Sequence, residues 1–263
     1  MNPTLLSTDA MYDRLREVPH NQVYFFTISG EGGQQLYYLG SHHTHDPENT
    51  QFREIEELFD RFIQSTNEGE RQVLVESAGQ LPQYTDRDIA IKRSREVGFT
   101  ALLARQKGVE VISPEPTKIE EVKLLLQQYS KDEVFYHLMS GICWNYSKMK
   151  SDVRSDFMKY IKFQLEEYAQ MEEFKDFDLS IEHFLKMYKS KYPDTPFNYE
   201  NTKLFYDEQK PAVGNISEAS SKIRDEVIVR KIEELWKQGK SIFIVYGLGH
   251  AIVQEQALKD LLD

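Results

Sequence analysis

Apolar positions in the first part of the chain change from the spacing of strands to that of a helix. The runs 22–29 and 35–41 are rich in Tyr, Phe, Val and Ile, and the Gly-rich segment 30–33 between them is typical of a hairpin connection. From Asp46 and Pro47 onward, the apolar positions 52, 55, 58, 59, 62 and 63 form one stripe of a helix. This pattern predicts an antiparallel strand pair followed by a helix.

Short apolar strands and helices continue to alternate along the rest of the regular pattern. Strands are expected at 72–76 (QVLVE), 109–113 (VEVIS) and 241–247 (SIFIVYG). Helices are expected over about 88–103 and 217–238, with a last helix after the final strand. Such alternation is typical of parallel strands joined by right-handed crossovers. The expected fold class is α/β, with a mainly parallel mixed sheet flanked by helices and an N-terminal hairpin.

The middle of the chain, residues 119–210, has helical patterning dense in Tyr, Phe and acidic residues. We expect it to be a helical insertion or cap within one α/β domain that spans 1–263. Its aromatic side chains are expected to pack in a core. The single cysteine, Cys143, lies between Ile142 and Trp144, which favours a buried thiol over a nucleophile.

Charge and composition exclude several classes of partner. The net charge of -11 and the lack of a basic stripe oppose nucleic-acid binding. The longest apolar stretch is too short and too interrupted by glycine for a membrane span, and the first residues do not resemble a secretory signal. The expected location is therefore cytoplasmic, and the expected partner is a small-molecule or peptide substrate. A homo-oligomer is compatible with the sequence.

Polar side chains follow the predicted strands or precede the last one. They are His43, His45, Glu76, Glu115, Arg224 and His250. In open α/β sheets, ligands bind beyond the carboxyl ends of the strands, so we expect these side chains to meet there. Glu115 has an alternative role as a cap of the following helix, and Arg224 an alternative as an ordinary surface charge.

Two Gly-x-x-His (GxxH) turns carry the histidines of this group: GSHH at 40–43 and GLGH at 247–250. Glycine permits positive φ and close approach of a ligand, which predicts supporting roles for Gly40 and Gly247. His42 is expected to be a satisfied turn residue, whereas His43 is the candidate functional histidine. His45 stays balanced between the two interpretations.

Two kinds of chemistry are open to this set of residues. His43, Glu76 and His250 can together hold a divalent ion such as Mn, Co or Zn, which would activate water. Alternatively, one histidine acts as general base without a metal while Arg224 stabilises the oxyanion. In both, His45 and Glu115 would bind substrate or support the site, and the reaction is hydrolysis.

Four segments resemble the TraB/PrgY/GumN family, which includes the Tiki proteins: LGSHHTHDPEN, VLVES, GVEVISPEP and the C-terminal stretch from IRDEV through GLGHAIV. The family pattern of two Gly-x-x-His motifs, a Glu and an Arg maps onto His43, Glu76, Arg224 and His250. The resemblance implies the fold group of erythromycin esterase (EreA) and the haem-binding protein ChaN.

For activity, the resemblance implies metal-dependent peptidase or esterase-like hydrolysis. The alternative is a non-enzymatic binder of haem or peptide. Ile223 stands where the family often has an acidic residue, Ser77 and Ala78 also depart from its pattern, and the middle region has no counterpart.

Overall fold

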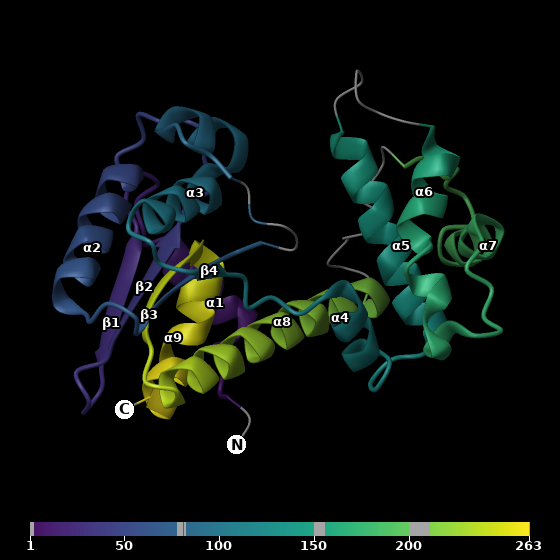
Figure 1. The fold of residues 1–263 in the computed structure, drawn as a ribbon. Helices are drawn as coiled ribbons and strands as arrows, with labels where there is room; N and C mark the ends of the chain where they lie inside the picture. Colours follow the sequence, from purple (N-terminus) through teal and green to yellow (C-terminus); the bar gives the residue numbers. More distant parts are fainter. Residues whose placement is uncertain (1–2, 78–80, 82, 150–155, 200–210, 263) are drawn as a thin grey trace. The chain divides into compact units, whose positions relative to one another are not determined.

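The computed structural model describes residues 3–77, 81, 83–149, 156–199 and 211–262, with side chains described from 215 onward in the last range. The chain divides into two compact units (Figure 1). The first comprises residues 1–116 and 224–263, and the second comprises residues 117–223. In sequence, the second unit is therefore inserted into the first.

The first unit is built on a five-stranded mixed sheet in the order β1-β2-β5-β3-β4. Strand β1 (Tyr24–Ser29) pairs antiparallel with β2 (Gln35–Ser41). Strand β2 and the next three strands are parallel: β5 (Ser241–Gly247), β3 (Arg71–Val75) and β4 (Val111–Ile112). The expected α/β class, with its N-terminal hairpin and mainly parallel sheet, is confirmed.

Helices cover both faces of this sheet (Figure 1). They are α2 (Gln51–Ser65), α3 (Arg87–Gln106), the part of α8 (Pro211–Lys237) from Arg224 onward, and α9 (Leu248–Leu262), on which α1 (Thr8–Leu15) packs. Among the described residues, no helix has the length and apolar character needed to cross a membrane.

Alternation of side chains along the strands separates the two apolar layers. Leu39 and Val245, which are paired across β2 and β5, belong to the cluster that includes Phe59 of α2. Their neighbours Tyr38 and Ile244, also paired, belong to the cluster formed with α8 and α9 on the other face. All of these side chains are buried. The central strand β5 is buried along its whole length, which explains why SIFIVYG shows no alternation of polar and apolar residues.

Three element boundaries differ from the sequence-based expectation. Helix α2 begins at Gln51 rather than near Pro47, because the intervening residues form a hydrogen-bonded turn in which Asn49 N–H donates to the Asp46 carbonyl. The strand expected at 109–113 is shortened to β4, since Val109 N–H donates to the Ala104 carbonyl as α3 ends. Helix α3 is broken at Ser94 and Arg95.

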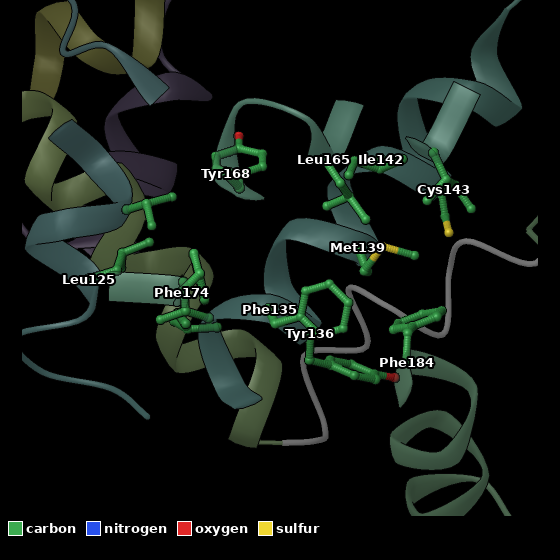
Figure 2. Packing of buried hydrophobic residues seen from close by; sticks show 14 of the residues in the cluster. Leu125, Phe135, Tyr136, Met139, Ile142, Cys143, Leu165, Tyr168, Phe174 and Phe184 are labelled. Carbon is green, nitrogen blue, oxygen red and sulfur yellow. The ribbon is translucent and has the colours of Figure 1, made fainter. Parts of the chain in front are cut away.

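The second unit is helical in its described residues, as the pattern predicted. It contains α4 (Lys118–Leu125), α5 (Lys131–Lys148), α6 (Phe157–Leu165), η1 (Tyr168–Gln170), η2 (Glu172–Phe174), α7 (Ile181–Lys191) and the beginning of α8. Figure 2 shows its core, in which Phe135, Met139 and Phe184 are fully buried. Cys143 belongs to this core, and burial raises the pKa of its thiol to about 12. The prediction of a buried thiol is confirmed.

Candidate functional site

The strand order brings three loop segments together at one edge of the sheet. Ser41 pairs with Gly247, and Val75 pairs with Val245, so the residues after β2, β5 and β3 emerge side by side. Helices α2 and α3, which follow β2 and β3, cover one face, whereas α9, which follows β5, covers the other. In open α/β sheets ligands bind beyond the carboxyl ends of the strands where the chain connections diverge in this way, so this edge is the expected place of a site.

His43 is held by a carboxylate that the sequence did not reveal. Its Nδ1 lies 2.6 Å from Glu96 Oε1, and Glu96 is fully buried while the His43 side chain is 43% exposed. The hydrogen bond to Glu96 raises the pKa of His43 above its ordinary value despite the opposing effect of burial. The other ring nitrogen, Nε2, lies 3.1 Å from the point where a Cβ on Gly247 would be.

His250 has a similar partner and a longer supporting chain of hydrogen bonds. Its Nδ1 lies 2.6 Å from Asp225 Oδ1, which also accepts a 2.6 Å hydrogen bond from Gln254 Nε2. The buried hydroxyl of Tyr38 donates in turn to Gln254 Oε1 at 2.8 Å. Burial lowers the pKa of His250, but Asp225 and Glu76 together outweigh it, and the net shift is upward.

Glu76 lies between the two histidines. Its Oε2 accepts a 2.9 Å hydrogen bond from Gly247 N–H, and its Oε1 lies 3.8 Å from both His250 Nε2 and Arg224 Nη2. Burial raises the pKa of Glu76, but His250, the Gly247 N–H, His43 and Arg224 together hold it below its usual value. Glu76 is therefore an anion around which the cationic groups are arranged.

Arg224 donates two hydrogen bonds to the Glu115 carboxylate, from Nε at 2.9 Å and from Nη2 at 3.0 Å. The Glu115 side chain is only 6% exposed, so this bidentate pair compensates a largely buried carboxylate. The alternative in which Glu115 caps the next helix is wrong, because Thr117 forms the cap of α4 in a capping box with Glu120. Arg224 is likewise not an ordinary surface charge.

The two glycines of the Gly-x-x-His turns provide close approach rather than positive φ, since neither is in the left-handed region. A Cβ on Gly40 would lie 2.7 Å from the Ala251 Cβ, so Gly40 allows α9 to pack against β2. A Cβ on Gly247 would instead lie 3.1 Å from both Glu76 Oε2 and His43 Nε2. Gly247 thus borders the site, and Gly40 has a packing contact.

The neighbouring histidines are directed elsewhere. His42 Nε2 lies 3.1 Å from the Pro19 carbonyl oxygen, and its backbone N–H donates to Gln51 Oε1, which agrees with its expected role in a satisfied turn. His45 Nδ1 lies 3.0 Å from the carbonyl oxygen of Lys92 in α3. The structure therefore brings His43, Glu76, Arg224, Glu115 and His250 together but anchors His45 on the helix.

Sequence reasoning missed Glu96 and Asp225. Asp225 had a usable signal, because it directly follows Arg224 and lies in the helix that precedes β5. Glu96 had none, because an unbroken α3 would have given no reason to direct this residue toward the end of β2.

The predicted metal ligands His43, Glu76 and His250 lie near one another but are not arranged around one point. In both His43 and His250, Nδ1 is occupied by a carboxylate and Nε2 lies on the side of Glu76, as in histidines that bind metals. Within the described ranges, however, no three His, Cys, Asp or Glu side chains are grouped as ligands of one ion. The residues as placed do not form a metal centre, and metal binding by His43, Glu76 and His250 stays a prediction.

Comparison of this chain with family models, with curated proteins and with solved structures finds no match. The fold and the arrangement of site residues therefore carry the functional argument.

Proposed function

We propose that this chain is a hydrolase that cleaves a peptide or ester bond by using His43 to activate water. The observation that carries the proposal is the hydrogen bond between His43 Nδ1 and the buried Glu96 carboxylate. A carboxylate accepts only, so Nδ1 holds the proton and Nε2 of the neutral ring is left as an acceptor. That acceptor lies beside Gly247 at the carboxyl ends of the strands.

The proposed step begins with water at the exposed side of His43. One O–H proton passes to Nε2, and the oxygen attacks the carbonyl carbon of the substrate to give a tetrahedral intermediate. Glu96 stabilises the imidazolium that forms, as the carboxylate does in a catalytic His–Asp pair. The imidazolium then returns the proton to the departing amine or alcohol as the bond to carbon breaks.

Two groups next to Glu76, His250 and Arg224, can stabilise the developing oxyanion with positive charge. Asp225 raises the pKa of His250 despite its burial, which favours a protonated imidazole there, and Arg224 is permanently charged. Glu76 accepts a hydrogen bond from Gly247 N–H and provides an acceptor for the second proton of the attacking water. These residues thus divide into a base, an acceptor and a cationic pair.

The second candidate is the metal-dependent form of the same hydrolysis, and the charge of the site favours it. The charged groups are Glu76, Glu96, Glu115, Asp225, Arg224 and Arg95, the last of which acts on the charge of His43. Four carboxylates and two guanidinium groups leave two negative charges when both imidazoles are neutral. A divalent ion would balance this charge, and the neutral imidazoles assumed in this count are the form in which histidine binds metals.

The test is hydrolysis of a panel of nitrophenyl esters and fluorogenic peptides by purified protein, before and after treatment with a chelator. His43→Ala is expected to lower kcat by about 100-fold or more, in the range of a lost general base. His42→Ala is the matched control, because His42 is adjacent in sequence but contacts Pro19 and Gln51, and it should retain activity.

The comparison of hydrolysis before and after chelator treatment also tests whether the reaction depends on a metal. If the chelator abolishes hydrolysis and Mn, Co or Zn restores it, the metal-dependent form is correct. Equal activity of the His43→Ala and His42→Ala variants would contradict both forms. A Soret band on titration with haem that is lost in His43→Ala would favour the non-enzymatic binder.

A further inference from the structure

The break in α3 is a local feature that the proposed step does not by itself explain. Ser94 (φ -137°, ψ 19°) and Arg95 (φ 51°, ψ -140°) are non-helical, and Arg95 has a positive φ that is unfavourable for a residue with a side chain. The second segment returns close to the first, since a Cβ on Gly98 would lie 2.8 Å from the Ala90 carbonyl oxygen. This conformation places Glu96 at the start of the second helical segment.

The environment of Glu96 is costly for a carboxylate. The residue is fully buried, Oε1 contacts His43 Nδ1, and Oε2 has no hydrogen-bond partner among the described residues. Burying a charge with one partner is unfavourable unless another interaction offsets it. The N-terminus of the second segment supplies part of that offset through the helix dipole. An apolar side chain at this position would avoid this desolvation cost.

The same helix makes a second contact with the loop after β2. The carbonyl oxygen of Lys92, just before the break, lies 3.0 Å from His45 Nδ1. The loop that contains His43 is therefore held at two points by residues on either side of Ser94 and Arg95. In a continuous helix the carbonyl of Lys92 would accept the N–H of Glu96, four residues further on. At the break this carbonyl lies against His45 instead, while the Glu96 side chain contacts His43.

We propose that Glu96 is a positioning residue that keeps the His43 proton on Nδ1 and directs Nε2 toward Glu76, and that the break in α3 exists to present it. This proposal rests on the proposed function, in which His43 needs a fixed tautomer to act as the base. A carboxylate with a structural role alone would act on stability and leave kcat of the folded protein unchanged.

The experiment compares Glu96→Met and Glu96→Gln with the control Thr100→Val. Methionine fills similar volume without an acceptor, whereas glutamine keeps a neutral acceptor. Thr100 lies one turn further along α3, is fully buried, and its hydroxyl has no hydrogen-bond partner in the part of the chain that the structure describes. The tautomer of His43 is read from ring ¹⁵N shifts without substrate, with the signal assigned by its loss in His43→Gln, and kcat and KM are measured separately.

Glu96→Met is expected to shift His43 toward the tautomer protonated on Nε2 and to lower kcat by about 100-fold or more with little change in KM. Glu96→Gln is expected to retain more of the Nδ1 proton and to lose less activity, although its neutral amide cannot balance an imidazolium. Thr100→Val should change neither measurement. If Glu96→Met does not fold, Glu96→Gln decides the matter, since wild-type kcat in that variant would overturn the proposal.

An unchanged tautomer in folded Glu96→Met would also overturn the positioning role, whatever the activity. A shifted tautomer in a protein whose wild type hydrolyses nothing would support the positioning role and refute the hydrolase. The two failures are thereby distinguishable.

Discussion

Replacing Gly247 with alanine tests the geometry of the candidate site most directly. The new Cβ would lie 3.1 Å from Glu76 Oε2, 3.1 Å from His43 Nε2 and 3.2 Å from His43 Cε1, whereas ordinary contacts begin near 3.4 Å. Both side chains must then move by a few tenths of an ångström. Glu76 is also tied to Gly247 N–H, so its displacement strains a 2.9 Å hydrogen bond.

The expected cost of Gly247→Ala is about 1–3 kcal/mol of unfolding free energy, the usual range for overpacking. Because the displaced atoms are those proposed to hold and activate water, kcat should fall by a larger factor than stability alone explains. Urea unfolding and ester hydrolysis provide the two measurements. Gly32→Ala is the control in the same unit, since the nearest atom to its Cβ is 3.7 Å away and its φ is not positive. Wild-type activity and stability in Gly247→Ala would refute the placement of His43 and Glu76 around this glycine.

Three further predictions concern the residues that support the site. The folded-state pKa of His250 is raised, because Asp225 and Glu76 together outweigh burial. The stability that its protonation contributes is therefore complete below pH about 6.5 and is lost as pH rises through the folded-state pKa. The stability difference between wild type and His250→Gln in urea should therefore shrink over that rise, and a growing difference would contradict it. Tyr38→Phe leaves Gln254 Oε1 without its buried donor and should cost about 1–3 kcal/mol in the same assay, where a cost near zero would refute the hydrogen bond. Arg224→Lys cannot form the two parallel hydrogen bonds to Glu115 and should lower both the midpoint of thermal unfolding and kcat. An unchanged midpoint and kcat would show that a single positive charge is sufficient.

Local patterns in the sequence were sufficient for much of the fold. The Gly-rich segment 30–33 between two apolar runs predicted the β1–β2 hairpin, and the uniformly apolar run 241–247 predicted the buried central strand. Both predictions depend on short-range effects, namely turn geometry and the burial of adjacent side chains. The limits of β4 were not predictable in this way, because the end of α3 uses the Val109 N–H that a longer strand would need.

The composition of the candidate site was divided between sequence and tertiary structure. His43, Glu76 and His250 were found from the sequence because each follows a strand, and the parallel order of β2, β5 and β3 necessarily brings such positions to one edge. Which imidazole nitrogen is available was decided only by the folded chain. The partner of His43 is 53 residues away in sequence, and it directly follows the break in α3 at Ser94 and Arg95.

A periodic pattern cannot reveal a contact of that kind, since it depends on a backbone conformation at two residues and on the packing of two distant segments. The sequence by itself therefore determined the strands, their alternation with helices and the residues at their ends. The tertiary structure decided the pairing of each histidine with a carboxylate, because hydrogen bonds between side chains need distances and directions that only the packed chain defines.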